Sequence, residues 1–338
     1  FPSSIIHKKA PIQFLSDATN ATFFGYHDKT PFSFDGTKLL AMSVEADDKN
    51  PKSECSHMNL GYFKRNAQGT FGNKFIPFSE TTTWSWQQGC MLQWNPSNPN
   101  NQVIFNKLIN GQYGAVLFDI NKKKTIKEFQ DPIYAVAPDG GKAVTLNFSR
   151  LGRLRPGYGY SLIPDYSKNE KAPLNDGLYI MNLYTGTKEL IVNLDNLARE
   201  INDIEAEHYI NHAVFSPESN KIAFFHRWLI NGKHRKTKFF IYDLNSKSYY
   251  VLEEKNKISH YCWIDNEYIL ATLQTEKNGK YKYTLYNIKT RHREIYNHIP
   301  LNTDGHPMKN PKKNEFIITD SRIDRKRNDH ILLFNREN

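Results

Sequence analysis

The sequence has little that would span a membrane, bind a structural zinc ion or form a disulfide framework. No apolar run in its 338 residues approaches the roughly 18 residues that a transmembrane helix needs. Its only cysteines, Cys55, Cys90 and Cys262, cannot all pair within the chain, and no CxxC spacing is present. Two of them lie in apolar, strand-like runs ("GCMLQW" and "HYCWI") and are predicted to be buried thiols.

Helical periodicity is also scarce. It is found only in "LDNLAREINDIE" (194–205), where a short helical insertion is predicted. Aromatic residues, by contrast, make up 13% of the chain, with 19 tyrosines and 21 phenylalanines. Flat and β-branched side chains pack well on pleated surfaces, so this composition favours a β-rich architecture.

The chain is basic, with 45 Lys and Arg against 35 Asp and Glu, a net charge of +10 and a pI near 9.2. This charge predicts an anionic polysaccharide, a nucleic acid or a phospholipid surface as partner; a lysine-rich protein without such a partner is the alternative. The basic residues are scattered ("NKKKT", "GKHRKTK", "RIDRKRND"), which argues against nucleic acid. The first residues, "FPSSIIHKKAP", lack a methionine. A mature end left by signal-peptide removal would predict a periplasmic or secreted protein, with a cytoplasmic one as the alternative.

One pattern recurs along the chain: a polar residue, a short apolar strand, a turn rich in Pro, Asn, Asp or Gly, and a second apolar strand. Four full copies are "MLQWNPSNPNNQVIFNKL", "IYAVAPDGGKAVTLNF", "HAVFSPESNKIAFFHRW" and "HPMKNPKKNEFIITDS"; "PFSFDGTKLLAMSV" and "HYCWIDNEYILATL" are shorter variants. Most copies are followed by a second hairpin, such as "GLYIMNLYTGTKELIV". Two hairpins make a four-stranded antiparallel blade, and a ring of such blades is a β-propeller.

The copies begin near residues 25, 90, 132, 208, 260 and 306, which predicts six blades at a spacing of about 50 residues. A seventh blade in the longer insertions is the alternative. The last copy offers only three strands, so "APIQFLS" (10–16) is predicted to supply the missing outer strand and close the ring. We therefore expect a single all-β propeller domain over 1–338, with a long loop insertion at 149–176 and the helical insertion at 194–205.

Histidines recur at one place in this repeat. When the fourth and sixth copies are aligned on their turns, His212 and His306 both lie four residues before the turn. His260 joins them when Trp263 is aligned with Phe215. In a propeller the first strand of each blade lines the central channel, so these positions are predicted to bring three imidazoles to the channel mouth.

Three imidazoles with one further nitrogen or oxygen donor form a common first shell for Zn²⁺ or Mn²⁺. His27 lies about two positions earlier in its copy, and "WSWQQGC" offers Gln88. The alternative is that each histidine only satisfies backbone groups in a narrow channel. The predicted divalent-metal site consists of His212, His260, His306, His27 and Gln88.

Loops after the second strand of each blade border the same channel mouth and are rich in binding groups. Arginines there suit carboxylates or phosphates, and tyrosine and tryptophan offer flat faces for sugar rings. A packed structural loop with solvated arginines is the alternative for the insertion. The candidates are Arg150, Arg153, Arg155, Tyr158 and Tyr160 in the insertion, with Trp86, His226, Arg227, Trp228 and Arg322 elsewhere.

A histidine-lined metal site flanked by arginines and tyrosines on a basic propeller resembles the β-propeller polysaccharide lyases of the oligogalacturonate lyase and ulvan lyase type. The resemblance covers the blade pattern over nearly the whole chain and the types of residue at the mouth. The chain departs from that family in having six predicted blades where oligogalacturonate lyase has seven, and in the spacing of the presumed ligands.

The resemblance implies a lyase that cleaves a uronate-containing anionic glycan by β-elimination. A divalent ion or cationic residues would neutralise the uronate carboxylate, while a base removes the C5 proton. The metal site would be the five residues named above, with Mn²⁺ or Zn²⁺ bound. Catalytic roles would fall to Arg153, Arg155, Tyr158, Tyr160 and His226, and substrate binding to Arg150, Arg227, Trp228, Trp86 and Arg322.

Two other functions compete with the lyase. "FSPESNKIAFF" and "APDGGKAVTL" are similar to TolB-type repeats, which implies a non-catalytic binding or scaffold propeller. A glycoside hydrolase would need a pair of carboxylates at the mouth. Asp28, Glu45, Asp47 and Asp320 are present, but they form no convincing pair in the sequence.

Overall fold

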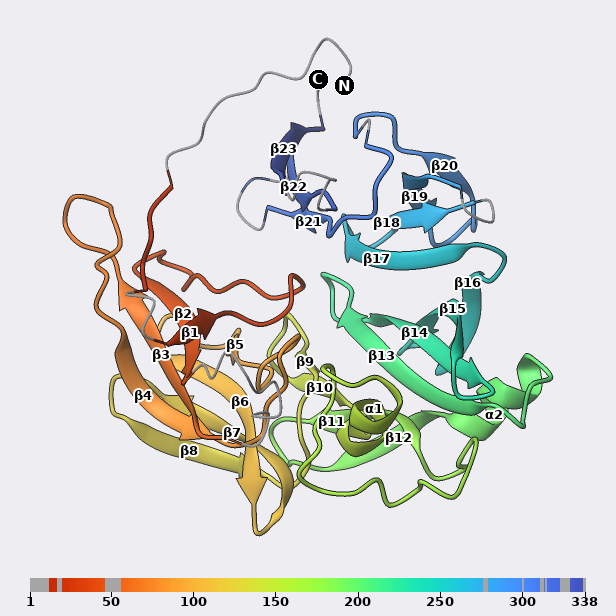
Figure 1. The fold of residues 1–338 in the computed structure, drawn as a ribbon, viewed down its shortest axis with the longest axis horizontal. Helices are drawn as coiled ribbons and strands as arrows, with labels where there is room; N and C mark the ends of the chain where they lie inside the picture. The colour runs from red at the N-terminus through yellow and green to blue at the C-terminus, as the bar shows by residue number, and fades with distance from the viewer. Residues whose placement is uncertain are drawn as a thin grey trace. The chain divides into compact units, whose positions relative to one another are not determined.

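A computed structural model describes residues 12–16, 20–45, 56–275, 279–299, 301–310, 313, 315–322 and 329–336. In this part of the chain the protein is all-β, with antiparallel sheets and two short helices, α1 (Phe148–Leu154) and α2 (Leu194–Glu200) (Figure 1). The fold is a β-propeller, as the sequence predicts. Neither helix is long and apolar enough to cross a membrane.

The described strands form six sheets, each with its strands paired in chain order. The first sheet contains β1 (Ala21–Phe23), β2 (Lys38–Val44), β3 (Met58–Lys64) and β4 (Ile76–Thr81). The second contains β5 (Gln93–Trp94), β6 (Gln102–Ile109), β7 (Gln112–Asp119) and β8 (Lys124–Phe129). The third contains β9 (Ala135–Val136), β10 (Lys142–Thr145), β11 (Gly177–Asn182) and β12 (Lys188–Asn193).

The fourth sheet contains β13 (Glu207–Phe215), β14 (Lys221–Ile230), β15 (His234–Asp243) and β16 (Ser248–Glu253). The fifth contains β17 (Lys257–Trp263), β18 (Tyr268–Gln274), β19 (Tyr281–Asn287) and β20 (Arg293–Ile295). The sixth has three described strands, β21 (Met308–Lys309), β22 (Phe316–Asp320) and β23 (Ile331–Asn335). The sequence predicts this three-stranded last blade.

The chain divides into two compact units. The N-terminal unit comprises residues 11–213 and 228–235 and holds the first three sheets. The C-terminal unit includes residues 214–227 and 236–338 and holds the fifth and sixth sheets. Strands β13, β14 and β15 of the fourth sheet contribute residues to both units.

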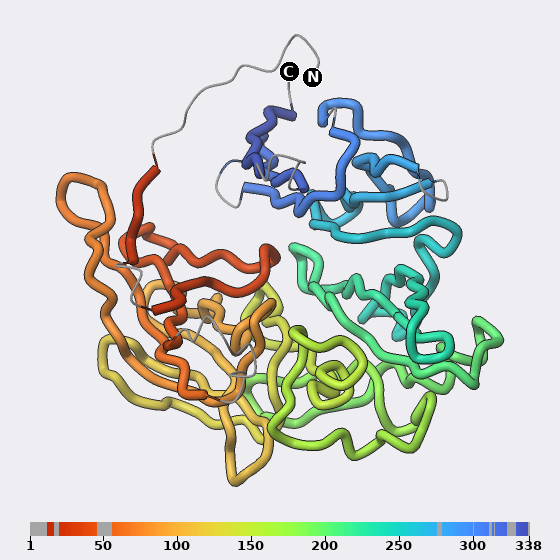
Figure 2. The backbone as a smooth tube through the Cα atoms, viewed as in Figure 1, coloured from red at the N-terminus to blue at the C-terminus, as the bar shows by residue number. Residues whose placement is uncertain are grey.

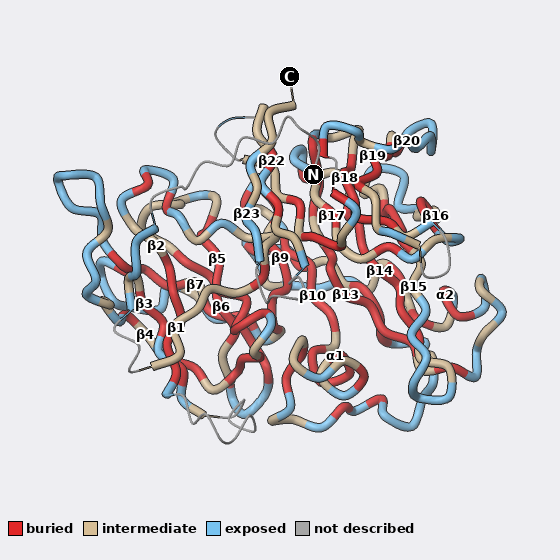
Figure 3. Tube along the Cα trace, turned by 45° about the horizontal axis from the view of Figure 1, so that its top comes forward, coloured by how far each residue is buried: buried red, intermediate tan, exposed pale blue. Residues whose placement is uncertain are grey.

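Each sheet of the N-terminal unit is buried by its neighbours along the chain. Phe105 of β6 packs in a core with Met42 of the first sheet, whereas Ile104, its neighbour on β6, packs with Met181 of the third sheet. Successive side chains of a strand point to opposite faces, so one strand contributes to two cores. Figure 3 shows the result, with buried residues along the inner strands and exposed residues at the connecting loops.

The C-terminal unit follows the same arrangement. Ile269 and Ala271 of β18 pack with Phe239 of the fourth sheet, while Leu270, between them, packs with Ile317 of the sixth sheet. All four residues named on β18 and β22 are at most 1% exposed. Near-continuous apolar runs such as "YILATL" are therefore strands that are covered on both faces.

One backbone hydrogen bond closes the first hairpin of every sheet. Its six N–H donors are Ser33, Asn95, Ala137, Ser216, Ile264 and Asn310, and the acceptors are the carbonyls of Lys38, Gln102, Lys142, Lys221, Tyr268 and Phe316. The alignment of the fourth and sixth copies on their turns is thereby confirmed. His212, His260 and His306 all lie four residues before their donor, so the histidine register is a property of the hairpins.

The two predicted insertions differ in outcome. The helix predicted within 194–205 is α2, whose N-cap residue Asn193 accepts a hydrogen bond from the Asn196 N–H. The predicted loop at 149–176 instead begins with helix α1, which leaves the sheet after β10 before the chain returns to β11 (Figure 2). The side-chain oxygen of Asn147 caps this helix. A pattern with Gly152 at its centre and a buried arginine gives no amphipathic signal for such a helix.

The closing strand of the ring stays a prediction. Residues 12–16 carry no strand, and Ala10 and Pro11 lie outside the described residues. Cys90 is a buried free thiol, as predicted, and Cys262 is a free thiol of intermediate exposure. Cys55 lies outside the described residues.

Candidate functional site

His260 and His306 form a contacting pair in the C-terminal unit, with ring centroids 3.9 Å apart and ring planes at 38°. His260 lies on β17 where the pairing register with β18 shifts between Ile258 and Tyr261. Such an irregularity re-aims side chains away from strict alternation. The His260 N–H donates to the Thr272 hydroxyl (3.2 Å) instead of to a ladder carbonyl.

Asp304 organises His260. It accepts hydrogen bonds from Ser259 Oγ (2.7 Å), Thr272 Oγ1 (3.0 Å) and His260 Nδ1 (3.2 Å). Burial by itself would raise the pKa of Asp304, but these hydrogen bonds and the His260 charge outweigh it and lower the pKa to about 2. Arg322, whose side chain is 72% exposed, adds a weaker contact at 3.4 Å. Asp304 is therefore an ionised acceptor at neutral pH.

Asp320 holds His306 in the same way. Its carboxylate accepts the His306 backbone N–H (2.6 Å) and lies 2.8 Å from the ring nitrogen Nδ1. Burial works to raise the pKa of Asp320, and the hydrogen bonds and charge of His306 lower it overall. A carboxylate only accepts, so Nδ1 of each neutral ring carries the proton and Nε2 carries the lone pair.

The electrostatics of the pair favour a neutral His260. Burial is the largest influence and lowers the pKa of His260, and the charges of His306 and Arg227 act in the same direction. The hydrogen bond with Asp304 opposes them without reversing the shift. A neutral imidazole with its Nδ1 proton on a carboxylate can accept a proton at Nε2 or ligate a metal there.

Gly305 lets these groups approach one another. A Cβ atom at this position would lie 2.2 Å from Tyr283 Oη and 2.5 Å from the Asp320 carbonyl oxygen. Only glycine allows the segment that carries Asp304 and His306 to lie so close to β22.

A second group of predicted residues meets in the N-terminal unit around Tyr134, which is fully buried. The Tyr134 hydroxyl accepts hydrogen bonds from Gln88 Nε2 (2.8 Å) and from the His212 backbone N–H (3.0 Å). His212 has a φ of 51°, a left-handed conformation that non-glycine residues seldom adopt. Such backbone strain is found preferentially at functional sites.

Aromatic rings surround His212. The Tyr26 ring lies 4.9 Å from His212 and 4.5 Å from His27, and Tyr158 lies 5.9 Å from His212. The Arg155 guanidinium lies over the Tyr158 ring at 4.8 Å. The structure thus brings His27, His212 and two insertion residues together in the N-terminal unit.

The predicted metal residues therefore fall into two groups, one in each unit. Among the described residues, no three His, Cys, Asp or Glu side chains converge in a way that could hold a metal ion. His260 and His306 would provide two donors. The described residues thus do not complete a first shell for a metal ion.

Two arginines of the insertion have structural partners. Arg150 is 1% exposed and donates to the backbone carbonyls of His208, Ser167 and Lys171. Arg153 bonds Asp165 (3.0 Å) and Glu207 (2.5 Å). Both side chains anchor α1 rather than present their charge to a ligand.

Two buried rings among the candidates also pack internally. Tyr160 stacks on Phe148 at 4.5 Å, and its hydroxyl accepts from Asn106. Burial raises the pKa of Tyr160 well above its usual value of 10. His226 is fully buried, with its ring 6.0 Å from Phe240.

The remaining substrate-binding candidates also make contacts within the protein. Arg227 lies over the Phe225 ring (4.8 Å), and Trp228 donates its indole N–H to Asp203 (2.8 Å). Trp86 packs against Phe23 and Trp84 at ring distances of 5.7 and 5.0 Å. Arg322 is the exposed member of the set.

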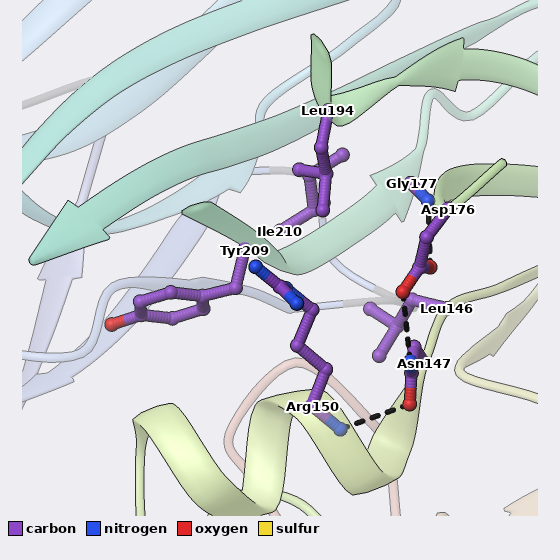
Figure 4. A pocket seen from close by; sticks show the side chains of 8 residues that line it. All are labelled: Leu146, Asn147, Arg150, Asp176, Gly177, Leu194, Tyr209 and Ile210. Carbon is purple, nitrogen blue, oxygen red and sulfur yellow. Dashed lines mark hydrogen bonds between the residues drawn. The ribbon is translucent and has the colours of Figure 1, made fainter. Parts of the chain in front are cut away.

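A small pocket in the N-terminal unit lies between α1, the start of β11 and β13 (Figure 4). Asn147 joins its walls by donating to Asp176 (2.7 Å) and accepting from the Arg150 N–H (2.9 Å). Burial raises the pKa of Asp176, although hydrogen bonds from Asn147 and the Arg150 charge oppose it. We assign this pocket to the anchoring of α1.

Sequence reasoning missed the residues that orient the histidines. Asp304 and Tyr134 had only faint signals: Asp304 precedes His306 by two residues in "DGHP", and Tyr134 is the second residue of the third copy of the repeat. Lys29, at the same distance before its turn as the three histidines, could have been found from the register.

The repeated hairpin and the antiparallel sheets define the chain as a β-propeller. No protein-family model matches the sequence, and no curated protein matches it significantly. Among solved structures, an oligogalacturonate lyase in complex with manganese has 13% identity and a TM-score of 0.61, with 94% of this chain and 76% of that chain covered. An oligogalacturonate lyase from Vibrio parahaemolyticus has 14% identity and a TM-score of 0.60, covering 94% and 77%.

A third similar structure is the β-propeller domain of the trilobed protease from Pyrococcus furiosus, with 15% identity, a TM-score of 0.51 and coverage of 90% of this chain and 79% of that chain. At these identities the likeness shows the shared fold alone.

Proposed function

We propose that the protein is a carbohydrate-active lyase that cleaves an anionic, uronate-containing glycan by β-elimination. The observation that carries the proposal is the His260–His306 pair, in which each imidazole is held by its own carboxylate. The net charge of +10 suits an anionic polymer. The likeness in fold to two oligogalacturonate lyases supports the same substrate class.

In this proposal His260 is the base. Its Nε2 removes the C5 proton, the C4=C5 double bond forms, and the glycosidic oxygen leaves C4. Asp304 stabilises the imidazolium that results, because its carboxylate stays ionised beside Nδ1. His306, once protonated, delivers a proton to the departing oxygen.

The C5 proton is weakly acidic, so negative charge that develops on the uronate carboxylate must be stabilised by a fixed cation. Arg322 is suited to this role because its side chain is 72% exposed and its guanidinium lies 3.4 Å from Asp304. Arg153 and Tyr160 have internal partners, so the proposal assigns proton transfer to the two histidines instead.

Binding of a divalent metal at Nε2 of His260 is the alternative to its role as base, because one lone pair cannot both hold a metal and accept a proton. The Nδ1–carboxylate contacts of His260 and His306 match the outer shell that usually supports histidine ligands of metals. Metal analysis of the purified protein and of His260→Ala distinguishes the two roles: about one equivalent of Mn or Zn in the first and a loss in the second would make His260 a ligand and not the base. The same metal content in both would remove His260 from the ligand set.

The elimination itself is tested by incubating the protein with a panel of uronate-containing oligosaccharides and following the near-ultraviolet absorbance of the unsaturated product. His260→Gln and His306→Gln should each lose activity by about 10²-fold or more. His292→Gln, at an exposed histidine in the β19–β20 turn, is the control and should keep full activity. If no uronate yields product, or if both site variants remain fully active, the lyase is ruled out.

A propeller that binds glycan or protein without reacting is the alternative, since the same fold forms the propeller domain of a protease. The alternative predicts saturable binding without unsaturated product.

We place the lyase in the periplasm or outside the cell, where it would encounter its polymeric substrate. Cell fractionation tests this location.

A further inference from the structure

Lys29 occupies the position of the three histidines in the first sheet. The hairpin hydrogen bond there is donated by Ser33, and Lys29 lies four residues before it, as His212 does before Ser216. A position that carries a histidine in three of the sheets therefore carries a lysine in the first sheet.

The surroundings of this cation are unusual for a lysine. Its Nζ lies 3.1 Å from both carboxylate oxygens of Asp28, and each of the two side chains is only 8% exposed. Nζ also lies 5.4 Å from the centre of the Tyr134 ring. An ammonium group has three donors, and within the described part of the chain the third has no acceptor. Shielding from water strengthens the attraction of such a group for an anion.

Gln88, which is hydrogen-bonded to the Tyr134 hydroxyl, has an acceptor without a partner. Gln88 is 1% exposed; its Nε2 donates to the Tyr134 hydroxyl, but its Oε1 is buried and has no hydrogen-bond partner among the described residues. Leaving a buried amide oxygen without a hydrogen-bond partner carries a desolvation cost. A ligand that brings a hydroxyl donor would recover that cost.

Close backbone contacts hold these groups together. A Cβ on Gly25 would lie 2.8 Å from the Gln88 carbonyl oxygen, and the Gln87 N–H donates to the Gly157 carbonyl (3.0 Å). The chain before β2, the Gln88 loop and the insertion therefore meet at one place. Tyr26 and Tyr158, with ring centres 6.0 Å apart, add aromatic faces.

We propose that Lys29 and Gln88 form a sugar-acid subsite in the N-terminal unit, in which Lys29 Nζ binds a uronate carboxylate and Gln88 Oε1 accepts a hydrogen bond from a ring hydroxyl. Lys29 is then a specificity-determining residue that selects the charged sugar. The inference rests on the proposed function for its ligand class. It adds a residue and a subsite that the elimination chemistry does not require.

The test is equilibrium binding of trigalacturonate and of its methyl ester, measured by calorimetry in a His260→Gln background so that ligand is not consumed. Lys29→Gln should weaken binding of the acid by about tenfold or more and leave the neutral ester unchanged. Asp28→Asn should strengthen binding of the acid, because it removes the carboxylate that competes for Lys29.

Lys29→Gln should weaken binding of the acid and Asp28→Asn should strengthen it, and these opposite changes in affinity distinguish a binding role from a structural one. If the ion pair with Asp28 serves folding alone, the two variants should have equal effects on the acid and the ester, and the subsite is overturned. Lys238→Gln is the control, since Lys238 is also ion-paired (Glu254, 2.8 Å) with a side chain 16% exposed. Unfolding curves for all variants show whether each remains folded.

Failure of this inference differs from failure of the proposed function. Unsaturated product with unchanged binding in Lys29→Gln retains the lyase and rejects the subsite. Charge-dependent binding without product from any uronate retains the subsite and rejects the lyase. A protein that binds trigalacturonate no better than its methyl ester rejects the subsite.

Discussion

Two carboxylates determine what the candidate histidines can do. Asp304 and Asp320 are acceptors only, so each fixes the proton of its partner at Nδ1 and leaves Nε2 for chemistry. Their geometry differs: Asp304 is 3% exposed with hydroxyl donors from Ser259 and Thr272, whereas Asp320 is more accessible and also binds a backbone N–H. His260 is consequently the more shielded imidazole of the pair, at 14% side-chain exposure against 35% for His306.

The lowered pKa of His260 predicts the acid limb of the pH–rate profile. Burial disfavours the charged ring, so His260 stays neutral until the pH falls below its ordinary value of 6.5. Activity should therefore be constant through neutral pH and decline only at lower pH, as the base becomes protonated. In Asp304→Asn the limb should move to still lower pH, because the carboxylate that favours protonation is gone, and activity should fall by about 10- to 100-fold.

The measurement is kcat/KM of the elimination against pH, with Asp139→Asn as control because Asp139 is a surface residue paired with Lys142. If the acid limb of the profile has its midpoint above pH 6.5, or if that midpoint moves to higher pH in Asp304→Asn, the assignment of His260 as base is contradicted.

The Asp304 carboxylate also makes the stability of the fold depend on pH. Its pKa is about 2 in the folded protein against 3.8 ordinarily, so its stabilising contribution is complete above 3.8 and is lost as the pH falls toward 2.

At the scale of elements, the hairpins place the histidines, the connection between β20 and β21 places Asp304, and the end of β22 places Asp320. The register shift in β17 turns His260 toward the segment 304–306, and Gly305 lets that segment approach β22. In the N-terminal unit, α1 plays a comparable part. Arg150 ties the helix to the His208 carbonyl of β13, and Tyr158 follows the same helix toward His212.

Gly305→Ala should disrupt the histidine pair. The new methyl group would meet Tyr283 Oη at 2.2 Å and the Asp320 carbonyl at 2.5 Å, so the segment or β22 must shift. We expect a loss of about 1–3 kcal/mol in the free energy of unfolding, as for other overpacked sites, together with loss of elimination activity. Denaturant unfolding and the product assay measure both.

Gly72→Ala is the matched control for Gly305→Ala. A Cβ there would meet only the Lys64 carbonyl at an ordinary 3.7 Å, so stability and activity should be unchanged. An active Gly305→Ala variant with wild-type stability would show that the close approach is not needed for the pair.

At the scale of the whole molecule, the excess of ten positive charges concerns association rather than fold. Cores on both faces of a sheet hold the blades together, as the opposite packing of Ile104 and Phe105 shows. Basic residues at the surface attract polyanions over a distance set by the ionic strength.

Affinity for an anionic glycan should therefore decrease as salt is raised. At about 1 M salt the Debye length is only ~3 Å, so we expect several-fold weaker binding of an oligouronate than at low salt, and little change for its methyl ester. Titrations of both ligands at a series of salt concentrations provide the measurement. Equal salt dependence for the acid and the ester would show that the net charge is not involved.

Local patterns predicted the sheets and the histidine register because turn residues and alternating strands act over a few neighbouring residues. The Ser216 and Asn310 turns closed as predicted, and helix α2 formed within its predicted range. Helix α1 was not predicted, because its buried face includes Arg150, which is satisfied only by carbonyls from distant segments. Asp165 and Glu207 were not predicted as partners of Arg153 for the same reason.

The sequence by itself determined a propeller of repeated hairpins with imidazoles in phase, since hydrogen bonds such as Ser216 to Lys221 span only a few residues. Only the tertiary structure decided which carboxylate each imidazole meets. His260 and Asp304 are 44 residues apart, and their contact depends on a β-strand irregularity and on a glycine that no local pattern identifies. Protonation state and tautomer follow from that contact, so the chemistry of the site is a property of the packed sheets.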